Sequence, residues 1–200
     1  MKLYHGTNYS SAVNICREGI DLACSKQYLD FGPGFYATPS YQHAAFTAIR
    51  RTDARNKRYR LSEEPYIVQF HYNPLKEKGI LIRSFRKPDA EWGRFVLSNR
   101  LEEEKLQAYH ITEHNQDSRY DICVGEIADG AVVNCAYQVN TGERKPGDIK
   151  YTEFLKENGR AYPLQYSFHT EKGLACISDL NCGILQNKER YIKMIRQDVR

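Results

Sequence analysis

Short β-strand patterns alternate with amphipathic helix patterns along this chain, and that alternation limits the folds it can adopt. β-Branched and aromatic residues cluster in PYIVQFHY, and GILIRSF, YDICVGEIADG and AYPLQYSFHT are further strand candidates. Between these segments, apolar residues recur at helical spacing. The mixture indicates the α+β class. The chain has 200 residues and no repeat or linker that divides it, so we expect a single domain over residues 1–200.

The first sixty residues show this pattern twice. A strand is predicted at residues 2–4, ending at His5, and a helix follows that Ser10 or Ser11 can cap. A second strand is predicted at GFYA, and Ser40 can cap the helix after it. The start of the chain is therefore expected to form two strand–helix units in succession.

Three more helices are predicted further along the chain. Pro88 suits the first turn of a helix in which Trp92, Phe95 and Val96 have the spacing of a buried face. An amphipathic helix is predicted around residues 151–157, ending near Gly159, and a basic C-terminal helix over residues 185–200. We expect the last of these to pack on the body of the protein rather than project from it.

The cysteines and the N-terminus indicate a reducing compartment. None of the six cysteines forms a C-x-x-C pair, so we expect small, buried, unpaired side chains. The N-terminus has no apolar signal segment, and no run is long enough to span a membrane. His110 and His114 share helical spacing but lack an evident third ligand. A cytoplasmic protein without a metal site or membrane contact is therefore expected.

Two glycine-containing motifs near the N-terminus point to a functional site. YHGT places His5 beside Gly6 in the first predicted strand, and DFGPGFYAT places Tyr36 after a Gly-Pro-Gly turn. Either motif alone is typical of an ordinary turn. Their order and separation, together with the later blocks YDICVGEIAD and QYSFHTEKGL, carry more information.

These four blocks, in this order, resemble the ADP-ribosyltransferase superfamily in its His-Tyr-Glu branch, which includes the poly-ADP-ribose polymerases and diphtheria-type toxins. More narrowly, they resemble a family of small bacterial proteins that are often encoded beside a short partner gene as toxin and antitoxin. The blocks extend from residue 4 to about residue 174. The resemblance implies an α+β, ADP-ribosyltransferase-like fold, in which two small antiparallel-rich sheets with flanking helices enclose an NAD cleft.

The resemblance also assigns roles to the residues of the first two motifs. His5 would hydrogen-bond a ribose hydroxyl of NAD, and Gly6 would bind the nicotinamide carboxamide through its backbone. Tyr36 would stack on the nicotinamide ring, whose positive charge suits an aromatic face. The other residues expected to bind NAD are Thr7, Phe31 and Gly34.

One position departs from the superfamily pattern. Gln165, at the start of QYSFH, stands where the superfamily has a Glu that stabilises the developing charge on the ribose. An amide can accept the same hydrogen bond, but loss of one preorganised electrostatic contact costs about 3 kcal/mol of transition-state stabilisation. Glu126 is the alternative for this role, and Asp129 or Glu171 could contribute.

The activity implied by the resemblance is NAD-dependent mono-ADP-ribosyl transfer, with NAD as the substrate. The bond between nicotinamide and ribose would break, and the ADP-ribose would pass to a protein or nucleic-acid acceptor. A bacterial toxin with a small antitoxin partner is the implied setting. Three alternatives stay open: an NAD glycohydrolase, a tRNA 2′-phosphotransferase, and a weakly active NAD- or ADP-ribose-binding module that acts through a partner. The Gln in the Glu position favours the last of these.

A basic segment, IRRTDARNKRYR, carries six cationic side chains against the single acid Asp53. Such a run usually forms the solvated end of a helix and the loop after it. Contact with the NAD pyrophosphate, with nucleic acid or with an acidic partner is the alternative, because arginine binds phosphate well. The net charge of +4 is mild and does not decide between these interpretations.

Overall fold

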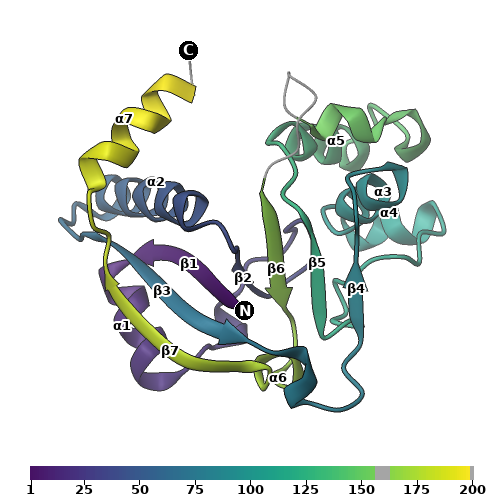
Figure 1. The fold of residues 1–200 in the computed structure, drawn as a ribbon. Coiled ribbons are helices and arrows are strands. Elements are labelled where there is room, and N and C mark those ends of the chain that lie inside the picture. The colour runs from purple at the N-terminus through teal and green to yellow at the C-terminus, as the bar shows by residue number, and fades with distance from the viewer. Residues whose placement is uncertain (156–162, 199–200) are drawn as a thin grey trace. The chain divides into compact units, whose positions relative to one another are not determined.

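The computed structural model describes residues 1–155 and 163–198, and within them the chain forms two units, each with one small sheet (Figure 1). The first unit consists of Met1–Asp21, Tyr36–Lys78 and Leu174–Arg200, and the second of Leu22–Phe35 and Gly79–Gly173. Two small sheets mixed with helices agree with the predicted α+β class.

The sheet of the first unit is antiparallel, in the order β1-β3-β7. PYIVQFHY forms a strand, as predicted, and this strand is the central one of the sheet. The first strand is longer than predicted, because it pairs with β3 along its whole length, so His5 lies within the strand and not at its end. The third strand was not predicted, since its sequence ISDLNCGI is polar and only half-buried. The strands are β1 (Lys2–Asn8), β3 (Pro65–Tyr72) and β7 (Ile177–Ile184).

Three helices, α1 (Tyr9–Glu18), α2 (Tyr41–Tyr59) and α7 (Lys188–Asp198), complete the first unit. Figure 1 shows α1 and α2 on opposite faces of its sheet. The Ser40 side chain accepts a hydrogen bond from the His43 backbone and caps α2, as predicted, whereas the N-cap of α1 is Asn8 and neither Ser10 nor Ser11.

The C-terminal helix α7 packs on α2, as expected. Its Tyr191 and Ile195 cover the cluster formed by α2 residues such as Ala45 and Ala48, and the Tyr191 ring lies 6.3 Å from that of Tyr41. The last two residues of the predicted range, 199–200, lie outside the described residues.

The sheet of the second unit is mixed, in the order β2-β6-β5-β4. β5 pairs with β6 antiparallel and with β4 parallel, so this sheet is less antiparallel than the sequence analysis implied. The division between the units falls after Phe35, within β2. The strands are β2 (Phe35–Ala37), β4 (Ile82–Ser84), β5 (Ile122–Glu126) and β6 (Leu164–Phe168).

The helices of the second unit are α3 (Ala90–Ser98), α4 (Glu103–Ala108), α5 (Ala131–Asn140) and α6 (Glu171–Leu174), at whose end the chain returns to the first unit. Trp92, Phe95 and Val96 of α3 are buried, as predicted. Asp89 caps this helix, so Pro88 precedes it and is not in its first turn.

Several helical segments of the second unit differ from expectation. Helices α4, α5 and α6 were not predicted. The helix expected at residues 151–157 is a short 3₁₀ turn, Tyr151–Phe154, and the rest of that prediction, with Gly159, lies outside the described residues.

The six cysteines, all within the described residues, form no disulfide, and their burial is uneven. Cys123, Cys135 and Cys176 are buried, whereas Cys24 is exposed and does not fit the expectation of a buried side chain. In the ranges that the structure describes, no helix is both long enough and apolar enough to cross a membrane.

Candidate functional site

The two N-terminal motifs meet in the first unit. The His5 ring lies against the second motif, with Nδ1 at 2.6 Å from the Tyr36 carbonyl oxygen. Beside this contact, Tyr4 and Thr38 exchange two backbone hydrogen bonds of 2.9 Å. The YHGT strand and the residues after GFYA therefore run side by side, which brings His5 and Tyr36 together although 31 positions separate them.

The contact with Tyr36 fixes the protonation state of His5. A carbonyl oxygen only accepts, so Nδ1 carries the proton and donates it. His5 is 9% exposed, and burial, assisted by the positive charge of Arg51, lowers its pKa to about 3 against the opposing effect of the Tyr36 hydrogen bond. The imidazole is therefore neutral near pH 7, and its Nε2 is a hydrogen-bond acceptor.

Gly6 lies where helix α2 packs closely on β1. A β-carbon at this position would lie 1.9 Å from the Ala44 carbonyl oxygen and 2.7 Å from the Ala48 backbone nitrogen. Such distances are impossible without moving the helix. Packing alone therefore requires glycine here, whatever its backbone binds. Thr7 is buried beside it and donates a hydrogen bond of 3.3 Å to the Asn8 side chain.

Gln165 lies in the second unit, and its amide group has a fixed orientation. Its Nε2 donates to Asp30 Oδ2 at 2.9 Å, in a buried setting. Because a carboxylate only accepts, the NH₂ group must face Asp30, and the amide oxygen is left for other partners. Asp30 also forms a 2.5 Å ion pair with Arg100 and accepts a hydrogen bond of 3.2 Å from the Ala128 backbone. The amide thus belongs to an organised polar cluster.

The rival carboxylates have different surroundings in the second unit. Glu126 ends β5, one position beyond the residue that pairs with Gln165, and burial raises its pKa. The Asp129 side chain accepts a hydrogen bond of 3.2 Å from the Ala131 backbone at the start of α5. Glu171 is exposed in the short helix α6. Of these three rival carboxylates, Glu126 is the one that lies in the strand paired with the strand of Gln165.

Gly34 is enclosed by polar groups of the same unit. The Ser25 hydroxyl lies 2.6 Å from its backbone nitrogen and 3.1 Å from its carbonyl oxygen. A β-carbon on Gly34 would lie 2.6 Å from His169 Nδ1. That nitrogen donates to the Pro33 carbonyl oxygen at 2.5 Å, and burial lowers the pKa of His169 to about 4. The chain therefore enters β2 along a fixed path.

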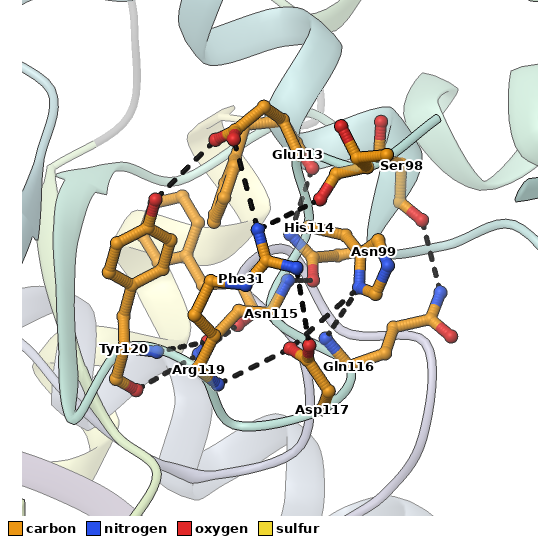
Figure 2. Close-up of polar contacts among 12 residues, drawn as sticks. Phe31, Ser98, Asn99, Glu113, His114, Asn115, Gln116, Asp117, Arg119 and Tyr120 are labelled. Atoms are coloured by element: carbon orange, nitrogen blue, oxygen red, sulfur yellow. Dashed lines mark hydrogen bonds and ion pairs between the residues drawn. The ribbon is translucent and has the colours of Figure 1, made fainter. Parts of the chain in front are cut away.

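The loop at residues 113–120 supports the turn at residues 31–34, which precedes β2 (Figure 2). Asn115 donates to the Phe31 and Tyr120 carbonyl oxygens at 3.4 and 3.3 Å, and the Asn99 side chain accepts from the Asn115 backbone at 2.7 Å. Gly32 has φ +86°, and a β-carbon there would lie 2.3 Å from the Asn115 carbonyl oxygen. The turn thus requires glycine.

The Phe31 ring lies in the aromatic core of the second unit. It is fully buried, with its centre 6.0 Å from that of Phe85 and 6.1 Å from that of Phe95. Packing accounts for this ring, and its expected contact with NAD remains a prediction.

The two buried histidines predict acid sensitivity. Their folded-state pKa values lie below the usual 6.5, at about 3 for His5 and about 4 for His169, so the unfolded chain binds more protons between these values and 6.5. The free energy of unfolding should therefore fall as the pH drops, by about 1 kcal/mol per histidine between pH 6.5 and about pH 5.5.

Urea unfolding at these two pH values measures the effect. His169→Gln should remove about half of the decrease in the free energy of unfolding between the two pH values. His110→Gln, at an exposed position, is the matched control. An equal pH dependence in the parent and His169→Gln would contradict the assignment.

Asp30 was not assigned to the predicted site from the sequence, and Arg51 was considered only as part of the basic segment, with contact to the NAD pyrophosphate as an alternative. Asp30 stands within the second motif, next to Phe31, but no role was predicted for it. Arg51 follows Ala44 and Ala48 on α2 at i+7 and i+3, so it shares the side of the helix that packs on Gly6. That spacing was visible in the sequence, but its meaning depended on α2 lying on the first strand.

Comparisons with known proteins give a family. A family model described as "Protein of unknown function (DUF3990)" matches residues 1–178, and the chain belongs to that family. No curated protein and no solved structure is similar enough to match the chain.

Proposed function

We propose that this member of the DUF3990 family is an NAD-dependent mono-ADP-ribosyltransferase with the ADP-ribosyltransferase-like fold. It would break the bond between nicotinamide and ribose and pass the ADP-ribose to a protein or nucleic-acid acceptor. A cytoplasmic bacterial toxin held in check by a small antitoxin is the proposed setting.

The contact between the two N-terminal motifs carries this proposal. His5 donates from Nδ1 to the Tyr36 backbone at 2.6 Å, which leaves Nε2 as an acceptor suited to a sugar hydroxyl. Burial keeps the ring neutral, so it can accept that hydrogen bond at physiological pH. The resemblance assigns ribose binding to His5 and nicotinamide stacking to Tyr36, and their proximity in the first unit supports both assignments.

The remaining roles are proposed from the resemblance. Gly6, Thr7, Phe31 and Gly34 would shape the NAD-binding surface. The Gln165 oxygen would accept a hydrogen bond from the nicotinamide ribose, which the orientation of its amide toward Asp30 supports.

Incubation with adenylate-labelled NAD and a bacterial lysate tests the activity. We expect release of free nicotinamide and transfer of the label to protein or nucleic acid, and nuclease and protease digestion of the product would show which. Label transfer should be lost in His5→Asn. No nicotinamide release in the presence of lysate would contradict an enzyme, and release without any labelled macromolecule would indicate a glycohydrolase.

A second candidate function is an NAD- or ADP-ribose-binding module with little turnover. The observation that favours it is the neutral Gln165, which is hydrogen-bonded to Asp30 and supplies no negative charge of its own. Calorimetry with NAD would show binding without turnover in that case, and a lysate would not stimulate nicotinamide release.

A further inference from the structure

Arg51 of α2 has an unusual partner for an arginine. Its Nη1 lies 3.4 Å from His5 Nε2, a neutral acceptor. Several other arginines are paired with acids, such as Arg100 with Asp30 at 2.5 Å and Arg144 with Glu153 at 2.9 Å. Across residues 1–155 and 163–198, no carboxylate forms an ion pair with Arg51. The guanidinium therefore has no counter-charge within that part of the chain.

The surroundings of Arg51 suit an anion from solution. The residue is exposed, so a ligand can reach it. Enough protein nevertheless surrounds its guanidinium that burial lowers its pKa, as expected for a cation without a counter-ion. An anion bound here would supply the missing negative charge. The planar guanidinium can donate two parallel hydrogen bonds to phosphate oxygens.

The neighbouring imidazole narrows the choice of anion. His5 Nε2 accepts a hydrogen bond, so it suits a hydroxyl group and repels phosphate oxygens. A ligand that satisfies both groups has a hydroxyl and a phosphate close together, as a nucleotide ribose has. The contact between Arg51 and His5 is long for a hydrogen bond, so a ligand hydroxyl can replace it at little cost.

Resting on the proposed function, we propose that Arg51 binds the diphosphate of NAD while His5 binds an adjoining ribose hydroxyl. Both residues belong to the first unit, where α2 packs on β1 at Gly6 and holds Arg51 beside His5. The site should therefore bind phosphate-bearing nucleotides more tightly than the corresponding nucleosides.

Calorimetry with ADP and with adenosine tests this assignment. Arg51→Gln should weaken ADP binding about 10- to 100-fold, the usual worth of a charge-assisted hydrogen bond, and change adenosine binding less than about 2-fold. Arg51→Lys keeps the charge but loses the pair of parallel donors of the guanidinium, so its affinity for ADP should lie between those of the parent and Arg51→Gln. Arg50→Gln is the matched control, because Arg50 is exposed on the adjacent position of the same helix, and it should bind ADP like the parent.

Several results would overturn the assignment. These are an absence of ADP binding by the parent, equal ADP binding by Arg51→Gln, an equal loss of adenosine binding, or an equal loss in Arg50→Gln. The proposed function fails separately: ADP bound through Arg51, with no nicotinamide release from NAD, would support the anion site and reject the enzyme. If the parent releases nicotinamide and Arg51→Gln releases it at the same rate, the result would support the enzyme and reject the anion site.

Discussion

Replacing His5 by asparagine is expected to lower kcat/KM for NAD about 100-fold, because a substrate that loses a positioning contact reacts about that much more slowly. Asparagine carries its side-chain nitrogen at the position of Nδ1, so the hydrogen bond to the Tyr36 carbonyl can persist. It has no atom at the position of Nε2. The variant therefore tests the acceptor nitrogen and spares the structural one, and nicotinamide release is the measurement.

His5→Gln and His5→Ala are the controls. Glutamine reaches the position of Nε2 but loses the Tyr36 contact, so it should keep more activity than asparagine and less stability. Alanine removes both contacts of the His5 side chain, including the hydrogen bond to the Tyr36 carbonyl oxygen, at a cost of about 1–3 kcal/mol. Parental activity in a well-folded His5→Asn protein would show that Nε2 does not contact the substrate.

Gln165→Glu is expected to destabilise the protein by about 2–3 kcal/mol at pH 8, because it places a second carboxylate against the buried Asp30. The Gln165 amide now donates to Asp30 at 2.9 Å, and a carboxylate cannot. Repulsion would raise the pKa of the new pair in the folded state. The destabilisation should therefore be largest at high pH and shrink as the pH falls and the pair takes up a proton. Urea unfolding at pH 8 and about pH 5 measures it.

The double variant Gln165→Glu/Asp30→Asn separates repulsion from other effects. It restores one carboxylate and one amide to the cluster. Its free energy of unfolding should therefore exceed the value expected from adding the effects of the two single substitutions by about 1–3 kcal/mol. Parental stability of Gln165→Glu at pH 8 would contradict the geometry.

The activity of Gln165→Glu carries separate information. If Gln165 occupies the catalytic position, the folded variant should release nicotinamide faster than the parent, because it regains a negative charge beside the developing cation. Activity should be compared well below the unfolding temperature of the variant.

The sequence predicted elements best where periodicity and capping agreed. The strand PYIVQFHY, the Ser40 cap and the buried face of α3 are all local patterns, and the structure confirms them. Strand β7 was missed because an edge strand with polar, half-exposed residues has no clear alternation. The start of α3 was placed too early because Pro88 suits the residues before a helix as well as its first turn.

The candidate site was predictable only in part. The glycines marked both motifs, and the structure explains three of them by close approach: Gly6 to α2, Gly32 to Asn115, and Gly34 to His169. The partners of the predicted side chains came from distant segments, as with Asp30, which is 135 positions from Gln165. No local pattern encodes such a pair, so the buried cluster around Gln165 could not be foreseen.

The close contact between Gly6 and α2 has a consequence for genetic screens. Almost any substitution at Gly6 would displace the helix and lower the amount of folded protein in the cell. If the chain is toxic, such variants would be recovered as harmless survivors alongside true active-site variants. Immunoblots of the survivors would distinguish the two groups, since variants at His5 Nε2 or Arg51 should accumulate normally and those at Gly6 should not.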